Sequence, residues 1–144
     1  MKLSRFSDCA VRVLIYAALK EDTFQIEEVS VVYGISRHHL AKIVQELSKL
    51  GYLDTQRGRG GGIQLARKPE DIRIGQLLRK TEDPALVECF DAATNTCRLD
   101  GSCKLKAALK KAQVAFYDSL DEHTLRDFVT GPQHDRMVKV LLQE

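Results

Sequence analysis

The chain has 144 residues, of which 44% are hydrophobic and 29% charged, and its formal net charge is +2. This length and composition fit one globular domain, or a small domain with a helical extension, and exclude a fibrous or largely disordered chain. No segment approaches the roughly 18 consecutive apolar residues that span a bilayer, and the first residues lack the pattern of a signal peptide. We therefore expect a cytoplasmic protein with reduced cysteines and no membrane partner.

Charge is divided unevenly along the chain. Residues 1–80 carry 14 Lys and Arg against 9 Asp and Glu, a net charge of +5, whereas residues 81–144 carry 8 against 11, a net charge of −3. A positive first part is the sign expected where phosphates are contacted. Because the excess is modest, charge alone leaves both nucleic-acid binding and chance scatter open.

A first amphipathic helix is predicted near the N-terminus. Ser7 and Asp8 precede apolar residues at helical spacing, which makes Ser7 the candidate N-cap, and the pattern ends near Lys20. Asp8 also suits the first turn of a helix without any metal, because the helix dipole favours an acidic side chain there.

Two further helices have the spacing of a helix-turn-helix. The second spans about 26–33 and ends at Gly34, and the third follows Ser36, its candidate N-cap, and runs to Gly51. Helices joined by a tight turn that contains glycine, the second opening with polar residues, are typical of this motif.

A β-hairpin is predicted directly after the third helix. Residues 52–56 and 63–65 have extended character, and the glycine-rich segment 57–62 joins them. A hairpin in this place forms the wing of a winged helix. A phosphate-binding loop is disfavoured, because no Gly-Lys-Ser/Thr sequence ends the glycine run.

The residues predicted to contact DNA lie at the start of the third helix and on the wing. A recognition helix presents its N-terminal residues to base edges in the major groove. Those residues here are Ser36, Arg37, His38 and His39, with Lys42 one turn on. Arg37 suits guanine, whereas Ser36 and Lys42 suit phosphates.

The wing contributes two further basic residues. Arg57 and Arg59 on the glycine-rich loop suit the minor groove or the phosphates. A solvated helix start and a plain glycine-rich hairpin are the alternatives that do not involve DNA.

The second half of the chain alternates helix and loop. A fourth helix is predicted over about 72–80, followed by a loop over 82–102. A narrow apolar stripe then predicts a long helix that packs on a partner helix; its residues are Leu105, Leu109, Ala112, Phe116 and Leu120. We predict a mainly α fold with three parts: a winged helix-turn-helix domain (1–80), a cysteine loop (81–104) and a dimerisation helix with a C-terminal tail (105–144).

Three of the four cysteines are grouped in the loop. Their spacing is Cys89-x7-Cys97-x5-Cys103, without the short C-x2–4-C unit of structural zinc sites. Widely spaced cysteines suit an iron–sulfur cluster, in which each iron is held by a thiolate. The spacing favours such a cluster but leaves zinc, a redox disulfide and incidental cysteines open. Cys9 stands alone and suits a small buried residue.

The whole chain to about Val129 resembles the bacterial winged-helix iron–sulfur regulators that include the NsrR, IscR and RirA types. The segments that carry the resemblance are MKLSRFSDCAVRVLIYAAL, YGISRHHLAKIVQELSKLGYLDTQRGRGGGIQLA, IRIGQLLRKTE and CKLKAALKKAQVAFYDSLDEHTLRDFV. The resemblance implies a homodimeric transcription factor, not an enzyme, whose cluster controls binding to double-stranded operator DNA.

The ligand set implied by the resemblance points to the NsrR type. Cys89, Cys97 and Cys103 would hold a 4Fe–4S cluster, with 2Fe–2S as the alternative. An IscR-like protein has a histidine three residues after the last cysteine, where this chain has Lys106. NsrR-like proteins have an aspartate in the first helix that reaches the cluster of the partner subunit, and Asp8 matches that position.

The resemblance therefore predicts a repressor that nitric oxide releases from DNA. We further hypothesise that Arg12, one turn after Asp8, pairs with it when no cluster is bound. The alternatives are an iron-responsive regulator of the RirA type and a thiol or zinc switch without a cluster.

Overall fold

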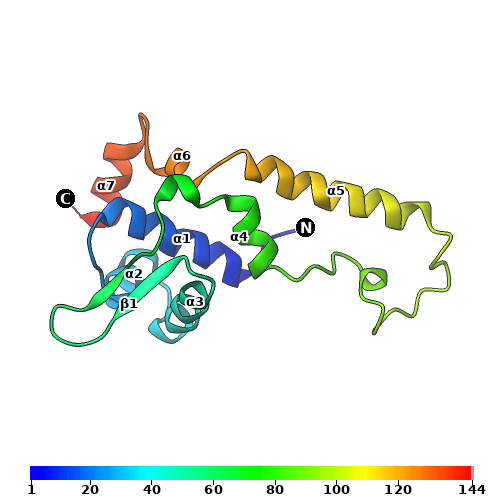
Figure 1. Cartoon of the computed structure of the whole chain (residues 1–144), viewed down its shortest axis with the longest axis horizontal. Helices are drawn as coiled ribbons and strands as arrows, with labels where there is room; N and C mark the ends of the chain where they lie inside the picture. Colours follow the sequence, from blue (N-terminus) through cyan, green and yellow to red (C-terminus); the bar gives the residue numbers. More distant parts are fainter. Residues whose placement is uncertain (144) are drawn as a thin grey trace. The chain divides into compact units, whose positions relative to one another are not determined.

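The computed structural model describes residues 1–143, which form a mainly helical fold with one β-hairpin (Figure 1). The chain divides into two units, one made of Met1–Ile72 with the segment from Thr124 onward, the other of Arg73–His123. None of the helices in the described range is long and apolar enough to cross a membrane. The predicted fold class, mainly α with a small β-hairpin wing, is confirmed.

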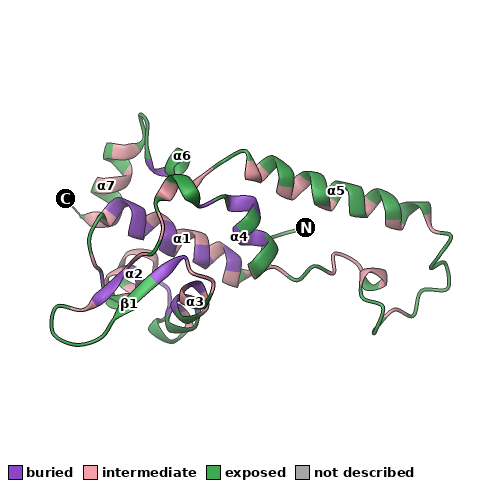
Figure 2. Ribbon diagram, in the orientation of Figure 1, coloured by how far each residue is buried: buried purple, intermediate pink, exposed green. Residues whose placement is uncertain are grey.

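The first unit begins with three helices: α1 (Arg5–Lys20), α2 (Ile26–Tyr33) and α3 (Arg37–Lys49). α1 is its central element and packs against α3, and most of its length is buried (Figure 2). Val13 and Leu14 of α1 and Ile43 and Leu47 of α3 are fully enclosed. Burying each such side chain contributes roughly 1.5–3 kcal/mol, so this apolar core holds α3 in place.

The start of α1 differs from the prediction. The N-cap is Ser4, whose hydroxyl accepts a hydrogen bond from the backbone N–H of Ser7 at 3.1 Å. Ser7 itself is completely buried inside the first turn. The prediction of Ser7 as N-cap was wrong because serine can cap from either position, and the burial of Ser7 in the fold decides between them.

The hairpin consists of β1 (Leu53–Gln56) and β2 (Gly62–Leu65), paired antiparallel with Gln56 opposite Gly62. Phe24, just before α2, adds an isolated bridge to Ile63 of β2, with backbone hydrogen bonds of 2.8 and 2.9 Å. At Gly61 an added Cβ would collide with the carbonyl oxygen of Gln56. Glycine is therefore required at Gly61 for the tight closure of the wing tip.

Two short helices complete the first unit. They are α6 (Leu125–Val129) and α7 (His134–Leu142), and both pack against α1. A 3-10 turn, η1 (Pro69–Asp71), contacts α6, and the Leu125 N–H donates to the carbonyl of Ile72 at 2.8 Å. The sequence analysis placed both in a C-terminal tail and predicted no separate α6, because five residues are too few for a clear periodicity.

The second unit pairs α4 (Ile74–Thr81) with the long helix α5 (Lys104–Asp121), joined by an irregular loop that contains the 3-10 turn η2 (Glu88–Phe90). α4 and α5 pack closely, and Arg79 of α4 forms ion pairs with Asp118 and Asp121. No residue of α5 is buried (Figure 2).

Candidate DNA-binding surface and cysteine pocket

The N-terminus of α3 presents polar side chains to solvent. Ser36 is its N-cap, and its hydroxyl accepts a hydrogen bond from the His39 N–H at 3.2 Å. Arg37, His38 and Lys42 are exposed. His39 is half-buried and its Nε2 atom lies inside the protein, so it has less free surface than its neighbours. The helix start therefore offers three exposed basic or imidazole side chains.

Arg37 is restrained by the preceding helix. Its Nη1 atom lies 3.5 Å from Oε1 of Glu27 in α2, and both side chains are mostly exposed. Both also line a cavity of about 550 Å³ between α2, α3 and the hairpin. An exposed pair of this kind contributes little to stability, and its effect is to orient the guanidinium.

The wing is attached to the start of α2 by a side chain that sequence reasoning missed. Gln25 Nε2 donates to the carbonyl oxygen of Gly61 at 2.8 Å, across 36 residues of sequence. Arg57 and Arg59 extend from the tip as exposed side chains. No local pattern marks Gln25, because its partner is a backbone atom brought close only by the fold.

Arg67, which follows β2, was also missed. Its Nε donates to the carbonyl of Gly51 at 2.8 Å and its Nη2 to that of Leu50 at 3.1 Å, while the guanidinium lies 4.7 Å from the ring centre of Tyr52. These carbonyls close the C-terminal end of α3, where a positive charge is favourable. Arg67 therefore fixes the C-terminal end of α3, whereas Arg37 lies at its exposed N-terminal end.

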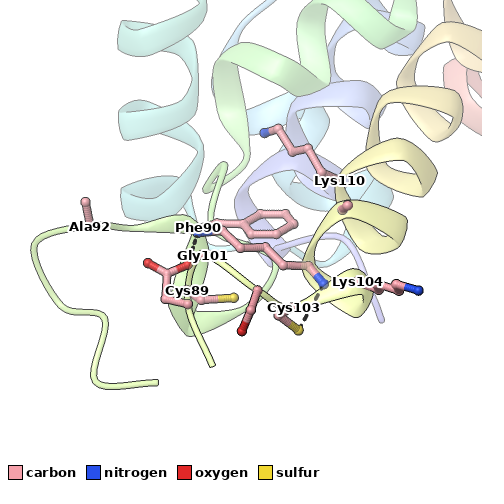
Figure 3. A pocket seen from close by; sticks show the side chains of 11 residues that line it. Cys89, Phe90, Ala92, Gly101, Cys103, Lys104 and Lys110 are labelled. Atoms are coloured by element: carbon pink, nitrogen blue, oxygen red, sulfur yellow. Dashed lines mark hydrogen bonds and ion pairs between the residues drawn. The ribbon is translucent and has the colours of Figure 1, made fainter. Parts of the chain in front are cut away.

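The cysteine loop forms a cavity of about 850 Å³ with the start of α5. Cys89 and Cys103 both line it, and Figure 3 labels the two side chains on its wall. All four cysteines are free thiols, and Cys97 is exposed and does not line the cavity. The structure thus brings two of the three grouped cysteines to one cavity.

Cys103 is also the N-cap of α5. Its Sγ accepts a hydrogen bond from the backbone N–H of Lys106 at 3.4 Å. This hydrogen bond satisfies one of the free backbone N–H groups at the helix start and fixes the position of the sulfur there.

Two polar contacts shape the loop around the thiols. The Glu88 carboxylate accepts hydrogen bonds from the backbone and hydroxyl of Thr96, which lower the pKa of Glu88. Because Glu88 precedes Cys89 and Thr96 precedes Cys97, this contact draws the two cysteine-bearing segments together. On the other side, Lys106 Nζ forms an ion pair with Asp100.

Lys106 and Asp100 stabilise each other's charged forms. The pKa of Lys106 is raised, first by its hydrogen bond to Asp100 and to a smaller extent by the charges of Cys89 and Cys103. The pKa of Asp100 is lowered, chiefly by Lys106. A cationic side chain therefore lies on the wall of the cavity that both thiols line.

Asp8 lies in the first turn of α1 with half of its side chain exposed. Arg12 Nη2 donates to Asp8 Oδ2 at 2.8 Å, so the predicted ion pair is present. The same guanidinium lies 5.7 Å from the ring centre of Tyr33, whose pKa is raised to about 12 by burial against the opposing effect of Arg12. Asp8 is thus linked through Arg12 to the last residue of α2.

Residues 3–131 match Rrf2, a family described as an iron-dependent transcriptional regulator. The chain belongs to the Rrf2 family. It is 45% identical over 139 residues to the HTH-type transcriptional regulator NsrR of Bacillus licheniformis, covering 94% of this chain and 97% of that protein. It is 46% identical over 136 residues to NsrR of Bacillus subtilis, covering 92% and 93%.

Solved structures show the same fold. CymR (YrzC), the global cysteine regulator of B. subtilis, superposes with a TM-score of 0.70 at 24% identity, covering 89% of this chain and 95% of that one. T. potens IscR gives a TM-score of 0.71 at 24% identity, covering 90% and 86%. The winged-helix fold and the resemblance stated from the sequence are therefore confirmed: this Rrf2 protein is a DNA-binding transcriptional regulator and not an enzyme.

The Rrf2 chain has residues suited to an iron–sulfur cluster. Three free thiols lie in one loop, and two of them share a cavity whose wall includes Lys104, Lys106 and Lys110. Such a wall suits the negative charge of a thiolate-ligated cluster. Within residues 1–143 no three His, Cys, Asp or Glu side chains are already grouped closely enough to hold a metal ion. Binding would therefore require Cys97 to move from solvent towards Cys89 and Cys103.

Proposed function

We propose that this Rrf2 regulator is a nitric-oxide-responsive transcriptional repressor that binds operator DNA as a homodimer and carries a 4Fe–4S cluster. The observation that carries the proposal is the cavity shared by Cys89 and Cys103, with lysines on its wall. The extensive identity to regulators named NsrR supports the choice of signal.

Cys89, Cys97 and Cys103 would hold the cluster, and Asp8 of the other subunit would supply the fourth ligand. The chemistry that the cluster supplies when bound is iron that reacts with nitric oxide. A carboxylate is a harder ligand than a thiolate and is displaced more readily from cluster iron. Asp8 is therefore the ligand whose release would report the signal.

The residues around Asp8 support a route from ligand to DNA. Once released, Asp8 is free to pair with Arg12, as it does in the described structure. Arg12 also covers the ring of Tyr33, which directly precedes the turn at Gly34. A change of partner at Asp8 would thus alter contacts at the turn between α2 and α3.

DNA binding would use the start of α3 and the tip of the wing. Arg37 and His38 would face base edges, Ser36 and Lys42 would approach phosphates, and His39 would support the helix start from its half-buried position. Arg57 and Arg59 would follow the minor groove or the phosphates. Two-fold symmetry of a dimer requires paired half-sites on the operator.

We assign DNA binding to residues 1–80, cluster binding to residues 81–104, and dimerisation to the long helix of the part 105–144, whose C-terminal tail packs on α1. The predicted apolar stripe of α5 supports this assignment, since Leu105 is 64% exposed and Leu109, Phe116 and Leu120 on the same face are only partly covered in the single chain. An apolar helix face of this kind is suited to burial against a second copy.

The deciding experiment is anaerobic purification followed by titration with nitric oxide in the presence of operator DNA. A brown protein with about four irons and four sulfides per subunit, which leaves DNA as a few nitric oxide molecules per cluster are added, is the expected result. A colourless protein with zinc or no metal would refute the proposal and favour a thiol or zinc switch.

An iron-responsive regulator is the second candidate, because the matched family is described as iron-dependent. The same preparation distinguishes the two. If DNA binding survives nitric oxide but is lost when a chelator removes iron, the iron-responsive function is correct.

A further inference from the structure

Lys106 lies on the wall of the cavity that Cys89 and Cys103 line. Its backbone N–H donates to Cys103 Sγ, so the residue is attached to one thiol through the helix start. Its side chain lines the same cavity as Cys89 and Cys103. One residue therefore contacts Cys103 through its backbone and places its positive charge on the wall that both thiols share.

Asp100 limits the freedom of this ammonium group. The two side chains form an ion pair, and Asp100 also accepts a hydrogen bond from Asn95 Nδ2 at 2.8 Å. Both Asp100 and Lys106 line the cavity. The carboxylate thus holds the lysine in place and, at the same time, partly neutralises the charge that the thiols experience.

The other lysines of the wall are placed differently. Lys110 Nζ lies 5.1 Å from the ring centre of Phe90, where a cation–π contact engages it. Lys104 is the first residue of α5, and its side chain is exposed. Of these wall lysines, Lys106 has both an anionic partner and a backbone hydrogen bond to a cysteine sulfur.

We propose that Lys106 is a positioning residue for the cluster: its charge retains the thiolate ligands Cys89 and Cys103, and Asp100 tunes that charge. The inference rests on the proposed function, because it assumes that the cavity takes an iron–sulfur cluster. A cluster held by three thiolates and a carboxylate carries net negative charge, so a nearby cation stabilises it. Accepting an electron adds further negative charge, and the same cation makes reduction easier.

The proposal predicts opposite effects for the two members of the pair. Lys106→Gln removes the cation, so the cluster should be lost to a chelator about tenfold faster and its reduction potential should fall. Asp100→Asn frees the cation from its counter-charge, so the reduction potential should rise. Lys106→Arg keeps the charge and should restore behaviour close to that of the original protein.

The test uses the anaerobically purified full chain, with cluster loss to EDTA followed by absorbance and the potential measured by titration with dithionite. Lys111→Gln is the matched control, because it makes the same change in charge on an exposed α5 residue outside the cavity wall. It should leave both measurements unchanged.

Each other outcome has a distinct meaning. If Lys106→Gln and Asp100→Asn shift the potential in the same direction, the pair only fastens the loop and the inference is overturned. A cluster that behaves identically in Lys106→Gln and the original protein overturns the inference alone. An original protein that binds no cluster overturns the proposed function as well.

Discussion

Arg12 and Asp8 form an ion pair across one turn of α1, with 2.8 Å between Nη2 and Oδ2, and the same guanidinium covers the ring of Tyr33. α1 is the central helix of the first unit and packs directly against the recognition helix α3. The candidate ligand is therefore part of the element that supports DNA reading. Any event that changes the partner of Asp8 acts on that element.

Asp8 and Arg12 should have opposite effects on the lifetime of the cluster. Asp8→Ala removes the fourth ligand, so three thiolates should retain the cluster but lose it several-fold faster to a chelator. Arg12→Gln removes the competitor for Asp8 and should slow the loss by about twofold, the effect of one exposed i,i+4 pair. Identical loss rates for Asp8→Ala and the original protein would exclude Asp8 from the site.

Arg37 and Lys42 should contribute differently to DNA binding. Arg37→Ala should cost about 1–3 kcal/mol on the operator and reduce discrimination against altered sites, because the proposed function places this residue at base edges. Lys42→Ala should weaken binding to all sequences alike and reduce the salt slope by about 1. Lys49→Ala at the other end of α3 is the control, and fluorescence anisotropy at several salt concentrations measures all three.

Arg57 and Arg59 on the wing should behave like Lys42. Each replacement by Ala should lower the salt slope by about 1 without changing the preferred sequence. If either variant retains the full slope, that residue makes no phosphate contact.

Arg67 should stabilise the fold through geometry rather than through charge. Arg67→Lys keeps the charge but cannot reproduce both hydrogen bonds to Leu50 and Gly51 with the contact on Tyr52, so the free energy of unfolding should fall by about 1–2 kcal/mol. Urea denaturation measures the change. Lys68→Arg, a conservative exchange at the exposed neighbour, should leave stability unaltered.

Gly75 allows the close approach of α4 to α5. An added Cβ would collide with the carbonyl oxygen of Tyr117 and the carboxylate of Asp121. Gly75→Ala should therefore destabilise the protein by about 1–3 kcal/mol in thermal unfolding, although alanine normally favours a helix. Gln76→Ala on the exposed side of α4 is the control; equal melting temperatures for both variants would contradict the close packing.

Tyr16 should make the protein sensitive to alkali. Burial and the hydrogen bond to Glu28 at 3.0 Å raise its pKa from 10.0 to about 12. Because the folded-state pKa is the higher one, its contribution to stability is complete below pH 10 and is lost as the pH rises from 10 to 12. Tyr16→Phe should lower the free energy of unfolding by about 1 kcal/mol at pH 7. Between pH 10 and 12 this variant should lose less stability than the original protein, as measured by urea denaturation at each pH.

Local sequence was sufficient for the elements with strong internal signals. Gly34 adopts the left-handed conformation that ends α2, and Ser36 caps α3 as expected. The glycine-rich hairpin and the long helix after Cys103 also lie where the pattern predicts. In each case the deciding interactions join residues a few positions apart, so that spacing and residue type carry the information.

The arrangement of the candidate site could not be predicted from local sequence. The sequence indicated that Cys89, Cys97 and Cys103 form a group, and the fold separates them into two thiols on a cavity and one in solvent. The ion pair of Lys106 with Asp100 and the shared cavity wall with Cys89 depend on how the loop folds, which no spacing rule contains.

By itself the sequence determined the winged helix, the cysteine group and the Asp8–Arg12 pair, because each depends on neighbours within a turn or a loop. The tertiary structure alone decided the N-cap at Ser4, the anchoring of the wing by Gln25 and the closure of α3 by Arg67. These contacts pair side chains with backbone atoms whose positions depend on how the helices pack. Burial and the packing of segments distant in sequence, rather than local propensity, determine those partners.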